Sequence, residues 1–297
     1  MYTKPYRETS ITSIQYKIDK HKDICLQLTY IHDAPKRLYV RGKLPVGQAI
    51  AIVGTRKPTA YGEEVAYRMA FELAQAGLII VSGLAYGIDT IAHRAAVAAG
   101  GKTVAVLGCG LDVCYPAANK VLAEQIVRSG GALVSEYDEG TPPLKHHFPA
   151  RNRIIAGMSM GVLVPEADAR SGSLITAYLA LDENRVVMAV PGAITSARSE
   201  GPNNLIRAGA VPIHGVDDIW TALGLMKHEA SDDGVVTKYK IGTLEHTVLT
   251  ALQARAMSAD GLAKLTQRPI QQVIEIMSLL ELTGEVTAVG TGQWIAR

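Results

Sequence analysis

The stretch AIAIVG, positions 49–54, shows the pattern that decides the fold. It is a short apolar run that ends in glycine, and a helix-like segment follows it. Six similar runs come later: LIIVSG (78–83), TVAVLG (103–108), GALVSE (131–136), GVLVP (161–165), RVVMAVPG (185–192) and, more weakly, AVPIHG (210–215). Apolar strands that alternate with helices are typical of a parallel sheet covered on both faces. We therefore expect an α/β fold, an extended Rossmann-like doubly wound parallel sheet of about six or seven strands.

The same alternation divides the chain into parts. Helices are expected at Gly62–Ala76, Asp89–Ala99, Ala118–Arg128, Arg151–Met158, Leu174–Asp182 and Asn203–Ala208. Residues 46–224 thus form the Rossmann-like domain, and residues 225–242 form a linker. In residues 243–297, three helix-sized pieces precede two β-like runs around Gly290–Gly292, which is the pattern of a small winged-helix domain. Residues 1–45 form a basic N-terminal extension, with nine Lys/Arg against four Asp/Glu, too short for a core of its own.

Composition limits the class of protein. Of the 297 residues, 48% are hydrophobic and 20% are charged, which is ordinary for a globular protein. The N-terminus has no secretory h-region, and no apolar run approaches the roughly 18 residues of a membrane span. Cys25, Cys109 and Cys114 lack metal-ligand spacing, which indicates reduced thiols in a cytoplasmic protein without a metal site. Because the net charge is only +2, an anionic partner must meet a local patch.

Ligands of an open parallel sheet bind beyond the carboxyl ends of its strands, where the strand order reverses. The first such loop, VGTRKPTAYGEE (53–64), lacks the G-x-G-x-x-G pattern, so no dinucleotide cofactor is expected. Arg56 and Lys57 follow the strand directly. They either face an anion or pair with Glu63 and Glu64, as charged loop residues usually do.

The loop SGLAYGIDTIAHRAA, positions 82–96, has the composition of an anion site. Ser82, Gly83 and Gly87 allow a tight turn with inward N–H groups, and Asp89 is the expected N-cap of the next helix. An ordinary strand-to-helix turn is the alternative.

The loop ADARSGSLITA, positions 167–177, repeats this arrangement. Ser171, Gly172 and Ser173 offer two hydroxyls and free N–H groups just before a helix, which suits an oxyanion. Simple hydroxyl capping is the alternative.

The stretch LKHHFPARNRIIAG, positions 144–157, concentrates positive charge around one of only two phenylalanines. Pro149 favours an extended Phe148, so the helix is expected to begin near Arg151. Arg151 and Arg153 would then lie in the first turn, where the macrodipole disfavours each cation by roughly 0.3–1 kcal/mol. A bound anion would offset this cost. Stacking of Phe148 on a base would stabilise the complex by about 1–3 kcal/mol.

These features together are typical of a site for single-stranded nucleic acid. In the alternative, Phe148 packs in the core and the arginines bind Glu136, Asp138 or Glu139. Spacing alone leaves both interpretations open. No catalytic constellation emerges, because the two histidines of the stretch have no nucleophile elbow nearby. A binding protein therefore fits better than an enzyme.

The motifs SGLAYGIDTIAHRAA, VLGCGLDVCYPAAN, HHFPARNRIIAGMS, EADARSGSLITA, AVPGAI and GPNNLIRAGA follow one another between Leu38 and Trp220. In this order they resemble the motifs of the bacterial DNA-processing protein family DprA, also called Smf. The resemblance implies an extended Rossmann fold that binds single-stranded DNA, forms a homodimer and loads RecA recombinase for natural transformation.

The resemblance also implies which residues contact DNA. Arg56, Lys145 and Phe148 match DNA-binding positions of the family, and Ser82–Gly87 matches its anion loop. Arg151, Asn152 and Arg153 match the same motif as Phe148, with roles that are partly structural. Asn203 matches a motif position without an assigned role.

Two features depart from the family pattern. Many members begin with a small helical SAM-like domain, and the roughly 45 residues before the Rossmann-like pattern leave no room for one. The winged-helix segment carries four Lys/Arg against five Asp/Glu, and its expected third helix, Pro269–Leu282, has Glu275 and Glu281 and no base. A helix that reads duplex DNA needs cations for the phosphates. This module is therefore expected to serve protein contact or autoregulation.

Two other functions are compatible with the fold class. Nucleotide-binding enzymes of the phosphoribohydrolase type carry a P-G-G-x-G-T-x-x-E loop with a catalytic Glu. The corresponding stretch here reads SGSLITAYL, positions 171–179, with no acid before Asp182, which argues against this activity. A protein-interaction scaffold with vestigial loops is the third interpretation.

Overall fold

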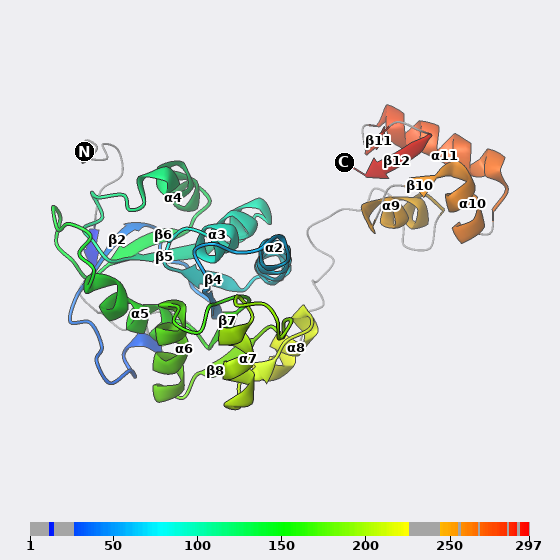
Figure 1. Cartoon of the computed structure of the whole chain (residues 1–297). Coiled ribbons are helices and arrows are strands. Elements are labelled where there is room, and N and C mark those ends of the chain that lie inside the picture. Colours follow the sequence, from blue (N-terminus) through cyan, green and yellow to red (C-terminus); the bar gives the residue numbers. More distant parts are fainter. Residues whose placement is uncertain are drawn as a thin grey trace. The chain divides into compact units, whose positions relative to one another are not determined.

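The computed structural model describes residues 12–14, 27–225, 244–254, 257–266, 268–283, 285–289 and 292–296. The chain divides at residue 228 into two compact units, which are described separately (Figure 1). Residues 226–242, nearly all of the predicted linker, lie outside the described residues, and so does Cys25.

The large unit contains a nine-stranded sheet in the order β1-β2-β6-β5-β4-β3-β7-β8-β9. The strands are β1 Thr12–Ile14, β2 Leu38–Gly42, β3 Ala49–Ile52, β4 Ile79–Ser82, β5 Thr103–Leu107, β6 Ala132–Ser135, β7 Gly161–Val164, β8 Val186–Ala189 and β9 Val211–Pro212. In the sheet order β6-β5-β4-β3-β7-β8-β9, all neighbouring strands are parallel. These seven strands coincide with the seven apolar runs. The predicted parallel α/β sheet is therefore confirmed.

The described part of the N-terminal range 1–45 is integral to this sheet. β2 pairs antiparallel with β6, and β1 pairs antiparallel with β2. Leu28 and Ile31 are buried in the same core cluster as residues of β3. The basic extension proposed from the sequence thus contributes two strands and part of the core.

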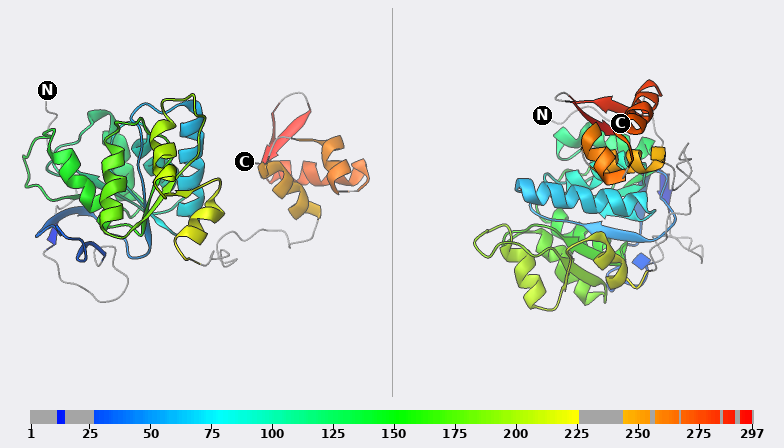
Figure 2. Two further views of the ribbon diagram at one scale, coloured as in Figure 1. Left: turned by 60° about the horizontal axis from the view of Figure 1, so that its bottom comes forward. Right: turned by 90° about the vertical axis from the view of Figure 1, so that its right-hand side faces the viewer.

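Helices cover both faces of the sheet (Figures 1 and 2). They are α2 Ala60–Gln75, α3 Ile88–Ala98, α4 Lys120–Arg128, α5 His147–Gly157, α6 Ser173–Asp182, α7 Glu200–Arg207 and α8 Val216–Ala222, with a 3-10 turn at Ala117–Asn119. The two faces of β3 serve different layers, because alternate side chains point in opposite directions. Ala49 and Ala51 belong to the core cluster with α5, α6 and α7, whereas Ile50 and Ile52 belong to the cluster with α2, α3 and α8.

The strand order reverses beside β3. The chain passes from β3 through β4 and β5 to β6 on one side, and then returns to β7 on the other side of β3. The loops after β3 and β7 therefore start side by side, and the Thr55 N–H donates to the Glu166 carbonyl over 2.7 Å. An open parallel sheet binds its ligands in the crevice at such a point.

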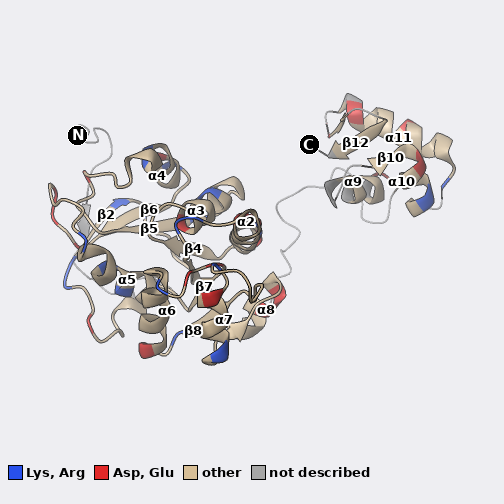
Figure 3. Ribbon diagram, in the orientation of Figure 1, with Lys and Arg blue, Asp and Glu red and all other residues tan. Residues whose placement is uncertain are grey.

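The small unit is a winged helix with its own core. Its elements are α9 Leu244–Ala254, β10 Met257–Ser258, α10 Ala259–Thr266, α11 Ile270–Leu282, β11 Val286–Ala288 and β12 Gln293–Ala296. The core consists of Val248, Leu252, Leu262, Val273, Met277, Leu280 and Val286. α11 carries Glu275 and Glu281 but no Lys or Arg, while Lys264 lies on α10 (Figure 3). Across both units, no helix within the described ranges has the length and apolarity to span a membrane.

Candidate nucleic-acid interface

A groove of about 670 Å³ lies where the strand order reverses. Its walls come from the loops after β3, β4, β5, β7 and β8 and from α5 with its preceding residues. The charged lining residues are the cations Arg56, Lys57, Lys145, Arg151 and Arg198 and the carboxylates Asp89 and Asp168. Arg56, Lys57 and Lys145 are exposed. No ion pair in the described part of the chain joins Arg56 or Lys57 to Glu63 or Glu64, so the rim of the groove is cationic.

α5 begins at His147, before the start predicted at Arg151. Pro149 is the third residue of the helix, where it removes no helical hydrogen bond, because the first four N–H groups have no acceptor within the helix. The predictions of an extended Phe148 and of a helix start at Arg151 are therefore wrong. The macrodipole argument fails as well, since Arg151 lies in the second turn.

Arg151 is a buried cation beneath the groove, with 5% of its surface exposed. Its Nη1 donates to the carbonyls of Val106 and Gly83, the latter over 2.8 Å, near the ends of β5 and β4. Burial raises the pKa of the neighbouring Asp89 carboxyl, and the charge of Arg151 counteracts this rise. Arg151 therefore ties strand ends together under the groove, which is a structural role.

Arg153 does not belong to the groove. Its guanidinium forms ion pairs with Asp33 and Glu136, each over 2.8 Å. The alternative interpretation of this stretch had predicted the pair with Glu136. Asn152 does line the groove, and its side-chain amide donates to the Gly172 carbonyl over 3.3 Å. Of the two, only Asn152 is positioned to contact a ligand.

Phe148 and Tyr115 form an aromatic wall of the groove. Their ring centroids lie 5.4 Å apart, and their planes are inclined by 39°. Phe148 is half-buried and packs over Gly108, where an added Cβ would lie 3.1 Å from the ring. Tyr115 is 44% exposed. The Phe148 ring is thus held by the fold without being sealed in the core, which suits a stacking platform.

The turn after β4 holds a carboxylate of the protein itself. Asp89 accepts the N–H groups of Gly83 over 3.1 Å and of Ala85 over 3.3 Å. It is the second residue of α3, whose N-cap is Gly87, so the predicted N-cap was wrong. The anion loop expected at Ser82–Gly87 is therefore occupied by an internal anion.

Ser82 and Gly87 have structural roles in the same turn. The buried hydroxyl of Ser82 donates to the Ile52 carbonyl over 2.7 Å, so it is not available to a ligand. Gly87 has a φ of 76°, and a Cβ there would lie 2.3 Å from the carbonyl oxygen of Thr55. Only glycine allows the two loops to approach this closely, and the approach positions Arg56 at the rim.

The start of α6 forms another wall of the groove. Ser171, Gly172 and Ser173 all line the groove, as predicted for a ligand site. The hydroxyls of Ser171 and Ser173 lie 2.8 Å apart, and Gly172 is exposed. The N–H groups of a helix start carry partial positive charge, so this wall suits an anion.

The groove residues that escaped the sequence analysis include Tyr115, Asp168 and Arg198. The available signal for Tyr115 was an aromatic residue before a proline in the loop after a predicted strand. Asn203, which had no assigned role, is structural. Its side-chain amide exchanges two hydrogen bonds with the backbone of Gly192, of 3.2 and 3.0 Å.

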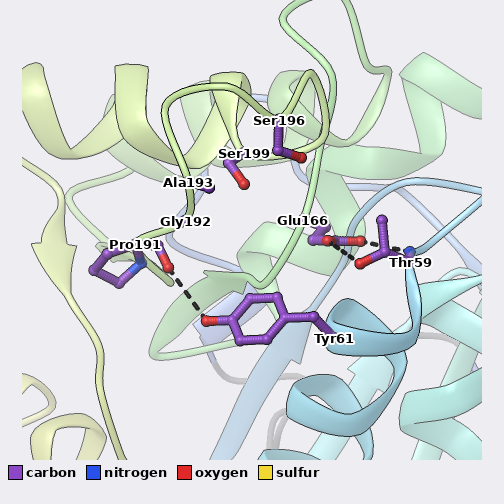
Figure 4. A pocket seen from close by; sticks show the side chains of 8 residues that line it. All are labelled: Thr59, Tyr61, Glu166, Pro191, Gly192, Ala193, Ser196 and Ser199. Atoms are coloured by element: carbon purple, nitrogen blue, oxygen red, sulfur yellow. Dashed lines mark hydrogen bonds between the residues drawn. The ribbon is translucent and has the colours of Figure 1, made fainter.

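A second pocket, of about 500 Å³, is lined by Thr59, Tyr61, Glu166, Pro191, Gly192, Ala193, Ser196 and Ser199 (Figure 4). It has no Lys or Arg, so it does not suit a phosphate. Glu166 is buried and accepts from the Thr59 N–H over 2.9 Å and from its hydroxyl over 2.6 Å. Both carboxylate oxygens are engaged, so this pocket offers no support for a hydrolytic base.

Comparison with known proteins identifies the family. The profile described as DNA recombination-mediator protein A, or DprA, matches residues 15–224. The chain belongs to the DprA family. A second profile, described as the DprA winged helix domain, matches residues 242–292. The resemblance seen in the motifs is therefore confirmed, and the winged helix is that of the DprA family.

Individual DprA relatives agree with this assignment. The chain is 38% identical to Protein Smf of Escherichia coli, over 90% of this chain and 73% of that protein. It is 47% identical to DNA processing protein DprA of Streptococcus pneumoniae, over 65% of this chain and 68% of that protein.

Two solved DprA structures share the fold. The Streptococcus pneumoniae protein matches with a TM-score of 0.65 and 43% identity, over 71% of this chain and 74% of that one. The Helicobacter pylori protein, described as having a unique single-stranded DNA binding mode, matches with a TM-score of 0.64 and 32% identity, over 73% of this chain and 96% of that one.

Proposed function

We propose that the groove binds single-stranded DNA and that the chain acts as a recombination mediator without an enzymatic activity of its own. The observation that carries the proposal is the aromatic wall of Phe148 and Tyr115 beside the exposed cations Arg56, Lys57 and Lys145. A stacking surface combined with phosphate-binding cations is the usual arrangement for single strands. The Helicobacter pylori relative with a single-stranded DNA binding mode supports it further.

The roles divide between the rim and the base of the groove. Arg56, Lys57 and Lys145 neutralise phosphates of the strand, while Phe148 stacks on a base. Ser171, Gly172 and Ser173 contact the strand from the start of α6, and Asn152 contacts it from α5. Arg151 acts indirectly, by holding the strand ends beneath the aromatic wall. Fluorescence anisotropy with oligo-dT and with a duplex of equal length tests this proposal, and equal binding of both would contradict it.

The proposal also includes two protein partners, a second copy of the chain and RecA recombinase. The chain acts as a homodimer and delivers the strand to RecA recombinase, as in natural transformation. Analytical ultracentrifugation tests whether the chain forms a homodimer. The rate of RecA ATP hydrolysis on DNA coated with single-strand binding protein tests whether the chain delivers the strand to RecA. A monomer at all concentrations, or no stimulation of RecA, would contradict the respective claim.

Replacing Lys145 with alanine is expected to weaken oligo-dT binding most at low salt. Lys145 is an exposed side chain of the groove, so its loss removes a phosphate contact at little cost to folding. The slope of log K against log salt should become shallower by about 0.7, the value for one phosphate on a single strand. A salt titration by anisotropy measures both effects.

Lys102 provides the matched control. It is also exposed, but it precedes β5 and therefore lies at the amino edge of the parallel strands, away from the groove. Lys102→Ala should leave both affinity and salt slope unchanged. If Lys102→Ala and Lys145→Ala have the same effect, binding is non-specific and the groove is not the site.

Removing the winged helix, residues 243–297, is expected to change neither oligo-dT nor duplex affinity. α11 lacks Lys and Arg, so it cannot neutralise the phosphates beside a groove. The Rossmann-like unit has its own hydrophobic clusters, separate from that of the winged helix. Anisotropy on both DNA forms measures the outcome, and lost duplex binding would show that the module reads DNA.

A further inference from the structure

Asp168 and Arg198 line the groove but have no part in the function proposed so far. Asp168 lies in the loop between β7 and α6, and Arg198 in the loop between β8 and α7. The Asp168 carboxylate accepts from Nη1 of Arg198. Both side chains remain in contact with water, with 43% of Asp168 and 30% of Arg198 exposed.

The ion pair is not needed to hold these two loops together. Backbone hydrogen bonds already join them, because the Ala167 N–H donates to the Arg198 carbonyl over 2.8 Å. The Gly201 N–H donates in turn to the Ala167 carbonyl over 2.9 Å. The backbone positions of Asp168 and Arg198 are therefore fixed independently of their charges.

Asp168 opposes the charge of the groove. Two carboxylates occur among the described lining residues, and the other, Asp89, is 7% exposed and bound to backbone N–H groups. Asp168 is thus the carboxylate that an incoming strand would meet. It lies on the same wall as Ser171 and Ser173, where the start of α6 favours an anion. A negative charge in this place repels the phosphates of DNA, so its presence in a DNA-binding groove calls for an explanation.

We propose that Arg198 is a further phosphate-binding residue and that Asp168 holds its guanidinium while no DNA is bound. A phosphate of the strand replaces the Asp168 carboxylate, which then turns to water. The exchange is geometrically simple, because the ion pair engages one nitrogen of a guanidinium that has five N–H donors. Asp168 thereby lowers affinity and eases release of the strand, which a mediator requires. This inference rests on the proposed function.

The test uses four full-length proteins: wild type, Asp168→Asn, Arg198→Gln and the double variant. Asparagine and glutamine keep the shape and hydrogen bonding of the loops while they remove the charges. Oligo-dT affinity is measured by anisotropy across salt concentrations, and thermal unfolding confirms that all four are folded.

We expect Asp168→Asn to bind oligo-dT several-fold more tightly than wild type. The oligonucleotide should also dissociate more slowly from this variant. Arg198→Gln should bind more weakly, with a salt slope shallower by about 0.7. The loss caused by Arg198→Gln should be greater in the Asp168→Asn background, because there no carboxylate competes for the guanidinium.

Other outcomes overturn the inference. Strictly additive effects would mean that the two charges act only through the general field of the groove. Weaker binding of both single variants would mean that the pair is a structural clamp. If Lys145→Ala weakens binding but Asp168→Asn does not strengthen it, only this inference fails. If wild type does not bind oligo-dT, the proposed function fails with it.

Discussion

Replacing Arg151 with methionine is expected to lower the free energy of unfolding by about 3–5 kcal/mol, measured by urea denaturation. Methionine keeps an apolar stem but removes the donor to the carbonyls of Gly83 and Val106. It also leaves Asp89 buried without its neighbouring cation. Removing one member of a buried charged set is costly, because Asp89 then keeps its two backbone N–H donors but has neither a cation nor solvent to balance its charge.

This loss should depend on pH. Burial raises the pKa of Asp89 and Arg151 counteracts the rise, so the pKa rises further in the variant. Between the unfolded and folded pKa values, the folded variant holds a proton that the unfolded chain has released. Its stability therefore falls as the pH rises through this range. The deficit relative to wild type is therefore expected to be smaller at the acid end of this range than at its alkaline end.

Arg153→Met is the matched control for Arg151→Met. Arg153 lies on the same helix, but its partners Asp33 and Glu136 are 75% and 28% exposed, so both carboxylates are in contact with water when the guanidinium is removed. A smaller loss is expected. The double variant Asp89→Asn/Arg151→Met should recover part of the stability. Equal losses for the two arginine variants, or no recovery, would contradict the structural role of Arg151.

Replacing Phe148 with alanine is expected to weaken oligo-dT binding by about 1–3 kcal/mol, or roughly 5- to 150-fold in Kd. The substitution removes the ring that packs over Gly108 and beside Tyr115, and with it the stacking surface of the groove. No charge is lost, so the salt slope should remain that of wild type. A loss of affinity with an unchanged salt slope distinguishes Phe148→Ala from Lys145→Ala, which changes both. An anisotropy titration across salt concentrations measures the affinity and the slope.

Phe71, the other phenylalanine of the chain, provides the control. It lies on α2, where its ring stacks on Tyr67 with a centroid distance of 5.9 Å. Phe71→Ala removes the same ring from a site away from the groove, so DNA affinity should not change. Phe148→Trp should retain binding, because a larger ring still stacks. Equal weakening by both alanine variants would attribute the loss to folding.

The sheet was predictable from sequence because its strands are buried on both faces. Each parallel strand then appears as a continuous apolar run, and the helices between the runs follow from the connections that parallel strands need. The position of Ser171, Gly172 and Ser173 in the groove was predictable for a related reason, because a polar cluster between a strand and a helix lies at the ligand edge of the sheet, while their role in binding stays a prediction.

The helix start and the partners of Arg151 were not predictable in the same way. The preference of a residue before proline for extended backbone is weak, and it yields where Phe148 gains packing over Gly108. The hydrogen bond from Arg151 to Gly83 joins residues 68 positions apart. Local spacing has no information about such a contact, so the charge of Arg151 was assigned to a ligand instead of to the interior.

Asp89 also closes one part of the groove to an anion from outside. A turn with free amides would hold a phosphate group. Here the amides of Gly83 and Ala85 are already taken by a side chain of the protein. The turn after β4 therefore offers no free amide cradle, and the anion-binding groups that remain in the groove are the cations of its rim and the start of α6. An acid buried below the surface thus leaves only the outer parts of the groove to attract negative charge.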